Sequence, residues 1–333
     1  MIGSIDLEYM RHGPGPVLRR WGSYFLFEGR SITARGRWLN PMIFAWLKAL
    51  ANLPGNPGVN APIFITGLGR SGTTILGVLL SLHRNVGHLS EPKALWQVID
   101  PRQDINTNYS TAGARFRLSA EDVTPEIALR ARRLYARYLG CAVARRVVDK
   151  YPEMIFRVGY LRAIFPDAKF IFITRGGPDA VISVAKWSER FGTKSDTHNR
   201  DWWGRNDQKW HYLREQLILQ DPAYQSVWSV ANSDLDDINR AALEWIVTMR
   251  EGLAQEQRYP HAVIRVAYET LLADPGGELV RLQQQCGLVP DPSVADYAKK
   301  RLYDNPAKGW PKLHPAVDAL FRDTMIKLGY DTP

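Results

Sequence analysis

The sequence predicts an α/β protein built as a three-layer sandwich, in which helices cover both faces of a central parallel sheet. Three apolar runs rich in β-branched residues carry this prediction, because a segment with helical spacing follows each of them. Strands that are apolar throughout indicate a sheet buried on both faces, and their alternation with helices indicates parallel pairing. The runs are 61–67, 145–150 and 168–175, and 261–272 repeats the pattern.

Residues 1–55 are predicted to form a basic, aromatic-rich helical extension, and 56–333 to form the main domain. The Pro- and Gly-rich segment 52–62 separates the two. The extension mixes Arg and Lys with Trp and Phe, which leaves two interpretations open: a helix packed on the domain, or a peripheral contact with an anionic membrane surface. Its most apolar stretch, 41–55, contains Lys48 and is shorter than the roughly 20 residues of a membrane span.

Composition narrows the function classes. The chain has 333 residues, a formal net charge of +9 and 45% apolar residues, which excludes a disordered protein and favours acidic partners. Only two cysteines are present, so no cystine framework is expected. The N-terminal residues lack the apolar core of a secretory signal, and we expect a cytoplasmic protein that contacts a membrane surface at most. The oligomeric state is not indicated.

A glycine-rich loop follows the first predicted strand. The segment 67–74, G-L-G-R-S-G-T-T, then opens a helix, a context in which backbone N–H groups and the helix N-terminus hold an anion. Thr73 stands where nucleotide triphosphatases have lysine, so hydrolysis of ATP or GTP lacks its usual cation. Arg70 supplies a cation instead, and its guanidinium can grip an anion with two hydrogen bonds. The other candidate binding residues of the loop are Gly69, Ser71, Gly72, Thr73 and Thr74.

A second anion site is predicted about a hundred residues later. Arg175 ends the strand 168–175, and the following helix starts near Pro178 and carries Ser183. An arginine at a strand end and a serine on the next helix can converge on one phosphate. The two motifs, in this order, support each other.

The loop F-I-T-G-L-G-R-S-G-T-T-I-L resembles the 5′-phosphosulfate loop of sulfotransferases that use 3′-phosphoadenosine 5′-phosphosulfate (PAPS), in the arginine-type branch of bacterial, carbohydrate and tyrosylprotein enzymes. The resemblance implies a P-loop-like fold, PAPS as the donor and no metal. It also implies that Arg175 and Ser183 bind the 3′-phosphate and that Tyr268 packs near the adenine. Lys308 lies in N-P-A-K-G-W, which is similar to the loop that closes over the cofactor.

The same resemblance assigns the chemistry. Glu91 stands at the spacing from Arg70 that the catalytic glutamate has in the tyrosylprotein branch, and we expect burial to raise its pKa toward neutrality. His88 is the rival base, because cytosolic sulfotransferases use histidine. Lys150, in D-K-Y-P, resembles a lysine that stabilises the departing phosphate together with Arg70.

The polar, Trp-rich segment 190–235 is predicted to be a helical insertion that forms a lid and, with 1–55, selects the acceptor. Trp202, Trp203 and Trp210 are candidates to stack on a sugar, aromatic or lipid group, or else to fill the core.

The sequence therefore predicts a PAPS-dependent O-sulfotransferase whose acceptor hydroxyl belongs to a carbohydrate, a glycolipid or a small natural product, with a peptidyl tyrosine or a phenol as alternatives. Two other classes remain as rivals. A P-loop kinase is disfavoured by Thr73. A nucleic-acid or anionic-membrane binding module is disfavoured because much of the informative charge lies at strand ends rather than along one continuous stripe.

Overall fold

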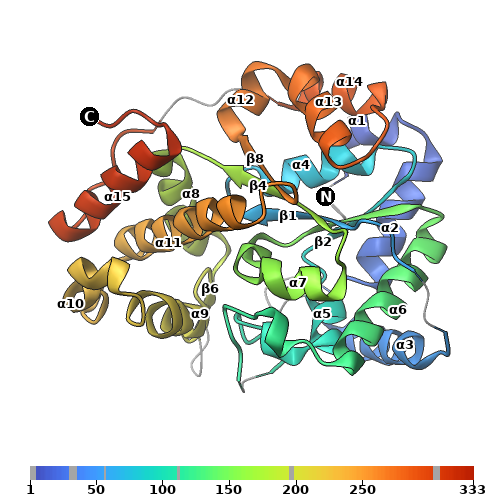
Figure 1. Ribbon diagram of the computed structural model, residues 1–333, viewed down its shortest axis with the longest axis horizontal. Coiled ribbons are helices and arrows are strands. Elements are labelled where there is room, and N and C mark those ends of the chain that lie inside the picture. The colour runs from blue at the N-terminus through green and yellow to red at the C-terminus, as the bar shows by residue number, and fades with distance from the viewer. Residues whose placement is uncertain (1–4, 30–35, 56–57, 111–112, 195–198, 303–307) are drawn as a thin grey trace.

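A five-stranded sheet forms the centre of the protein, and every strand pair in it is parallel (Figure 1). The computed structural model describes residues 5–29, 36–55, 58–110, 113–194, 199–302 and 308–333. The strand order is β2-β3-β1-β4-β8, which confirms the predicted parallel sheet. The strands are β1 (Ile63–Gly67), β2 (Val86–Ser90), β3 (Arg146–Lys150), β4 (Lys169–Thr174) and β8 (Val263–Ala267).

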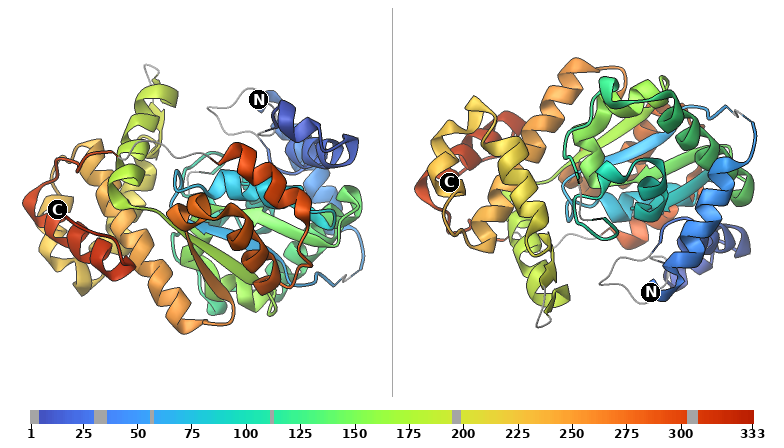
Figure 2. Two further views of the ribbon diagram at one scale, coloured as in Figure 1. Left: turned by 90° about the horizontal axis from the view of Figure 1, so that it is seen from above. Right: turned by 90° about the horizontal axis from the view of Figure 1, so that it is seen from below.

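Helices cover both faces of this sheet, as the three-layer prediction requires (Figures 1 and 2). Along β1 the side chains of Ile63 and Ile65 pack into one apolar core, and that of Phe64 packs into the other. The first core includes α4 (Thr73–Ser81), α12 (Tyr268–Ala273), α13 (Pro275–Gln285) and α14 (Pro292–Arg301). The second includes α5 (Lys93–Ile99), α6 (Pro125–Ala142), α7 (Val158–Ile164), α8 (Gly177–Phe191), α11 (Asp237–Arg258) and α15 (Pro315–Leu328).

Local sequence accounts for several helix starts. The Thr124 side chain accepts from the N–H of Ile127, with Pro125 at the first helical position of α6. The carboxylates of Asp236 and Asp274 likewise accept from a backbone N–H in the first turn of α11 and of α13.

The described residues of the predicted extension 1–55 form short helices at the end of the molecule opposite α10 (Trp228–Ala231) and α15 (Figure 1). Residues 1–4 and 30–35, which belong to the predicted extension, lie outside the described ranges. The helices are α1 (Leu7–Met10), α2 (Pro14–Leu26) and α3 (Asn40–Asn52).

The predicted insertion 190–235 contains a small antiparallel sheet and several short helices; residues 195–198 are not among those described. These elements are β5 (Thr193–Lys194), β6 (Asn199–Asp201), β7 (Gly204–Arg205), α9 (Gln208–Leu213) and α10 (Trp228–Ala231). Short 3-10 turns occur at Arg37–Leu39, Pro101–Gln103, Ala120–Asp122, Pro152–Arg157 and Pro222–Val227, and a π turn at Arg214–Ile218.

The register of the sheet brings its functional strand ends together. Ser90 pairs with Lys150 between β2 and β3, and Thr174 pairs with Ala267 between β4 and β8. The loop after the central strand β1 therefore opens between the ends of its two neighbours, which is where parallel sheets bind ligands. Within the described ranges, no helix is long and apolar enough to cross a bilayer.

Candidate functional site

The loop between β1 and α4 has a tightly constrained backbone. Arg70 and Gly72 adopt positive φ angles of 73° and 94°. A Cβ added to Gly69 would lie 2.5 Å from the indole of Trp202, and one added to Gly72 would overlap the ring of Tyr268. The loop therefore has an aromatic ring close to its backbone on each of two sides. Thr73 and Thr74 open α4 and line the adjacent cavity.

The predicted second anion site lies directly beside this loop. Arg70 donates from Nε to the Ser183 hydroxyl at 3.2 Å, and Arg175 donates from Nη1 to the Arg70 carbonyl at 3.1 Å. The Arg175 guanidinium also lies over the Tyr268 ring, 4.6 Å from its centre. Arg70, Ser183, Arg175 and Tyr268 thus form one cluster at the carboxyl edge of the sheet.

Lys308 joins this cluster through Asp179 on α8. Its backbone N–H donates to the Asp179 carboxylate at 2.8 Å, and its Nζ donates to the Asp179 carbonyl at 3.2 Å. Asp179 also pairs with Arg175 at 3.6 Å. Of the predicted closing loop, residues 305–307 lie outside the described chain.

The cluster concentrates positive charge that an anion would neutralise. Burial and the nearby Arg175 lower the pKa of Arg70. Burial and the cations Arg175, Lys186 and Arg70 likewise lower the pKa of Lys308, against the opposing effect of Asp179.

Two buried polar atoms beside the loop also fit an anionic ligand. Within the described chain, the Ser71 hydroxyl and the Arg175 Nε are buried and have no hydrogen-bond partner. A phosphate oxygen is an acceptor suited to such donors, so the residues present fit the group that the resemblance implies.

Glu91 and Lys150 form an ion pair at the ends of β2 and β3. Lys150 Nζ donates to Glu91 Oε1 at 2.5 Å, and the backbone N–H of Glu91 donates to the Lys150 carbonyl at 2.7 Å. Glu91 has a φ of 47°, a conformation that costs energy for a residue with a Cβ. Its side chain keeps 39% of its surface exposed, so it remains accessible from the cavity, whereas that of Lys150 keeps 3%.

The expectation of a raised Glu91 pKa is wrong. Burial alone would raise this pKa, but the ammonium groups of Lys150 and Lys93 oppose it and lower the pKa of Glu91 to about 2. Lys93 Nζ lies 3.8 Å from Glu91 Oε2. The carboxylate is therefore ionised throughout the physiological pH range.

His88, the rival base, faces the interior. Its ring lies against Gly77 of α4, and it is not among the residues that line the cavity. Burial, together with Arg20 and Lys150, places its pKa well below the ordinary value, so the imidazole is neutral. A buried ring in this position is not placed to take a proton from a ligand in the cavity.

A cavity of about 290 Å³ lies between the glycine loop and the insertion. We use the name donor-side wall for the lining residues of the glycine loop, the start of α4 and the end of β2: Gly69, Arg70, Thr73, Thr74 and Glu91. We use the name acceptor-side wall for the remaining lining residues: Lys93, Asn106, Asn108, Pro152, Glu153, Trp187, Arg200, Asp201, Trp202, Gly204, Arg205 and Lys209.

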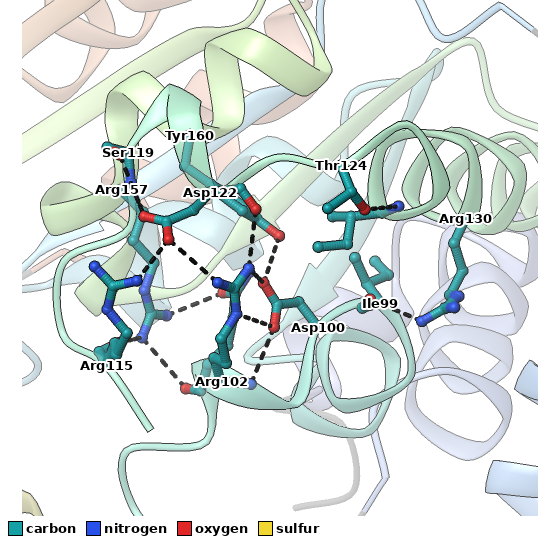
Figure 3. Close-up of polar contacts among 12 residues, drawn as sticks. Ile99, Asp100, Arg102, Arg115, Ser119, Asp122, Thr124, Arg130, Arg157 and Tyr160 are labelled. Carbon is teal, nitrogen blue, oxygen red and sulfur yellow. Dashed lines mark hydrogen bonds and ion pairs between the residues drawn. The ribbon is translucent and has the colours of Figure 1, made fainter. Parts of the chain in front are cut away.

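A polar network holds the long segment that brings Asn106 and Asn108 to the cavity (Figure 3). Asp122 accepts from Arg102 at 3.2 Å and from Arg115 at 2.5 Å. Fully buried Arg157 donates to the carbonyl of Arg115 at 2.8 Å. Arg157 belongs to the turn Pro152–Arg157 after β3, so its hydrogen bond ties the segment to the domain. A buried charged group such as this guanidinium requires hydrogen-bond partners.

The three insertion tryptophans have different environments. Trp202 lines the cavity, and its ring packs edge-to-face on the ring of Trp187 with 5.7 Å between the ring centres. Its indole N–H donates to the Glu244 carboxylate at 2.5 Å. Trp203 and Trp210 are buried core residues, 1% and 2% exposed. Stacking on a ligand is therefore possible for Trp202 alone of these three.

Sequence reasoning missed most of the acceptor-side wall. Lys209 is buried, pairs with Glu244 at 2.6 Å and lies over the Trp202 ring at 4.5 Å. Lys93 follows Glu91 by two positions in the sequence, and this spacing was the signal that could have placed Lys93 at the site. Lys209 and Asn106 lie far from any recognisable motif. Among the residues with described structure, no group of three or more His, Cys, Asp or Glu could hold a metal ion.

Comparisons with known proteins give one family-model match and two curated relatives, each over part of the chain. Residues 62–221 match the family model described as the sulfotransferase family. The chain is 28% identical to the nodulation protein NoeE of Sinorhizobium fredii over 37% of this chain and 30% of that protein. It is 32% identical to protein-tyrosine sulfotransferase 1 of Danio rerio over 37% of this chain and 34% of that protein. The chain thus matches about a third of the length of these relatives.

The solved structures that match this chain include the sulfotransferase domain from the Curacin biosynthetic pathway, with a TM-score of 0.48 and 14% identity over 83% of this chain and all of that domain. A sulfotransferase from Mycobacterium tuberculosis also has a TM-score of 0.48, with 16% identity over 98% of this chain and all of that structure.

Proposed function

We propose, from the premise that residues 62–221 are a sulfotransferase-family sequence, that the protein transfers a sulfuryl group from PAPS to an acceptor hydroxyl. One observation carries the proposal: Arg70, Ser183 and Arg175 meet at the glycine loop, on the same sheet edge as the Glu91–Lys150 pair. PAPS, when bound, supplies an activated sulfuryl group on a nucleotide that also carries a 3′-phosphate.

The donor would be held by the cationic cluster and the loop. The N-terminus of α4 and the hydroxyls of Thr73 and Thr74 are suited to the 5′ end, with Arg70 as the adjacent cation. Arg175 and Ser183 are suited to the 3′-phosphate, and the Tyr268 ring, already against the loop, is suited to the base. Lys308 adds a further cation from the C-terminal part of the chain.

Glu91 would accept the proton of the acceptor hydroxyl. It is ionised and accessible from the cavity, but its pairing with Lys150 keeps it a weak base. An anion that engages Lys150 would weaken this pairing and raise the pKa of Glu91. In this proposal the base gains strength as the donor site fills, and Lys150 and Arg70 stabilise the charge that develops on the departing phosphate.

The cavity favours a polyhydroxylated acceptor. Its acceptor-side wall combines the amides of Asn106 and Asn108 and the ammonium of Lys93 with the indoles of Trp187 and Trp202. Amides and charged groups bind hydroxyls, and indole faces stack on sugar rings. We therefore propose a carbohydrate or a sugar-bearing lipid as the acceptor, in preference to a phenol or a peptidyl tyrosine.

The test is a transfer assay with PAPS that carries radiolabelled sulfate. The protein is offered an oligosaccharide mixture, a simple phenol and a tyrosine peptide in parallel, and binding of adenosine 3′,5′-bisphosphate is followed by thermal shift. We expect stabilisation by the bisphosphate and label on the oligosaccharide fraction. Label on the phenol or peptide alone would overturn the acceptor class. Stabilisation by MgATP but not by the bisphosphate would overturn the reaction.

A further inference from the structure

Helix α2 exposes most of its large apolar side chains and buries two polar ones beside Val17. Leu18, Trp21 and Phe25 recur at helical spacing on its outer side, and Leu18 is 64% exposed. Arg20 and Ser23, in contrast, are buried. A surface helix of a globular domain normally has the opposite arrangement.

Polar contacts explain why α2 holds this orientation. Buried Arg20 pairs with Glu28, whose carboxylate also accepts from the N–H of Ser90 at 2.8 Å. The Ser23 hydroxyl hydrogen-bonds the Tyr138 hydroxyl at 2.8 Å. The inner side of α2 is thus anchored by an ion pair and hydrogen bonds, and Leu18 and Trp21 on the outer side remain exposed.

Helix α3 is apolar on both sides. Ile43, Leu47 and Leu50 pack into the domain. Met42 is 68% exposed on the opposite side, and Trp46 is also exposed. Trp38, just before the helix, is 74% exposed. Because the inner residues already provide the packing, the outer ones are not needed to hold α3 in place.

These side chains belong to one end of the molecule. Helices α2 and α3 contact each other and lie together at the end opposite α10 and α15 (Figures 1 and 2). We call Leu18, Trp21, Phe25, Trp38, Met42 and Trp46 the N-terminal face. An apolar groove of about 400 Å³ between α2 and the C-terminal end of α6 also has Leu18 in its wall.

The charge of this end is positive. Its carboxylates are engaged by cations: Asp6 pairs with Arg301 at 2.8 Å and Glu8 with Lys300 at 2.5 Å, and Glu28 is the buried partner of Arg20. Arg37 and Lys48 are exposed next to Trp38 and Trp46 in sequence. Cations beside exposed indoles are complementary to anionic lipid headgroups above an apolar layer.

We propose that the N-terminal face binds an anionic lipid bilayer peripherally, with its aromatic side chains at the level of the headgroups. The exposed indoles, the flanking cations and the short helices lying at the surface match an interfacial contact. This inference goes beyond the proposed function and does not depend on it, since no residue of the face lines the cavity. The two interpretations of the extension are then compatible, because α2 and α3 pack on the domain through their inner sides and contact the bilayer through their outer sides.

Vesicle flotation tests the proposal with the full chain. Wild type is mixed with phosphatidylcholine vesicles and with vesicles of equal parts phosphatidylcholine and phosphatidylglycerol. We expect flotation with the anionic vesicles, and weaker flotation with neutral vesicles or at high salt. The triple variant Leu18→Gln/Trp21→Gln/Phe25→Gln should lower the partition coefficient by about tenfold or more. A second variant, Arg37→Gln/Lys48→Gln, should lower it for anionic vesicles only.

The matched control is Val280→Gln/Val289→Gln/Ile326→Gln, which removes exposed apolar side chains elsewhere and should float like wild type. Circular dichroism and thermal melting establish that each variant is folded. Wild type that stays in solution with anionic vesicles would overturn the proposal. So would a folded triple variant that floats unchanged, or a solution dimer that the triple variant dissociates, since that result assigns the face to a second copy of the chain.

Discussion

The two walls of the cavity are constructed differently. The donor-side wall comes from the loop after β1, the start of α4 and the end of β2, and its Arg70 donates to the Ser183 hydroxyl and accepts through its carbonyl from Arg175. The acceptor-side wall comes from segments between Lys93 and Lys209 that are tied to the domain by buried ion pairs and hydrogen bonds. The sheet fixes the first wall, whereas the second can change without disturbing the sheet. Reaction and acceptor choice are therefore expected to respond to different substitutions.

The largest effect is expected for Glu91→Gln, which keeps the size of the side chain but removes the base. We expect kcat to fall by about a thousandfold with every acceptor, while the affinity for adenosine 3′,5′-bisphosphate stays within a few-fold of wild type. Glu189→Gln, on the exposed part of α8, is the matched control and should leave kcat unchanged. Undiminished turnover in Glu91→Gln would eliminate Glu91 as the base.

A smaller loss is expected for Arg70→Gln in the glycine loop. Removing one preorganised cation from a developing charge should lower kcat/KM by roughly a hundredfold or more, whichever acceptor is used. Arg258→Gln, at the end of α11, removes a cation outside the cavity and serves as the control. A loss confined to one acceptor would show that Arg70 acts on acceptor choice and would erase the distinction between the walls.

Trp202→Ala should affect binding of the acceptor more than the reaction itself. We expect KM for the acceptor to rise by about tenfold, because one stacking surface is lost, and kcat at saturating acceptor to change less. With a soluble oligosaccharide as acceptor, Trp46→Ala is the control, because it removes an indole that lies outside the cavity. A rise in the KM for PAPS alone would assign Trp202 to the donor, through its contact with Gly69.

The smallest effect is expected for Lys93→Met and appears in the pH dependence. The Glu91 pKa is lowered from its ordinary value of 4.5 to about 2, so the stabilisation that this carboxylate gains from its lysines is present above pH 4.5 and is lost as the pH falls toward 2. Removing Lys93 should raise the pKa and move the acid limb of kcat/KM to higher pH, by less than about one unit for a partly exposed pair.

Lys312→Met, at an exposed position away from the cavity, is the control for that measurement. An acid limb that moves to lower pH would contradict the arrangement of charges around Glu91.

The donor-side wall was largely predictable from sequence, because its residues are adjacent to strands that can be recognised one at a time. Gly69 and Arg70 of this wall, like Arg175 and Ser183 in the cluster beside it, follow apolar runs, and the rules of parallel sheets bring those ends together. The environment of Glu91 was not predictable, because its pKa depends on Lys150 and Lys93 together, and a linear sequence gives no distances between them.

The acceptor-side wall was largely unpredictable for the same physical reason. Asn106 reaches the cavity because buried Arg157 anchors the segment around it, and Lys209 does so because Glu244 and Glu153 hold its ammonium group. These are long-range contacts without a local sequence signature. The three insertion tryptophans illustrate the limit: they look alike in sequence, and only Trp202 lines the cavity.

Calorimetric binding of adenosine 3′,5′-bisphosphate and of adenosine 5′-phosphate to the same protein tests the central claim most directly. The claim is that Arg175 and Ser183 beside the glycine loop hold a 3′-phosphate. We expect the bisphosphate to bind tighter by roughly tenfold to a hundredfold, the effect of one or two charge-assisted hydrogen bonds, and Arg175→Gln to remove most of that difference. Equal affinity of wild type for the two nucleotides would contradict the claim.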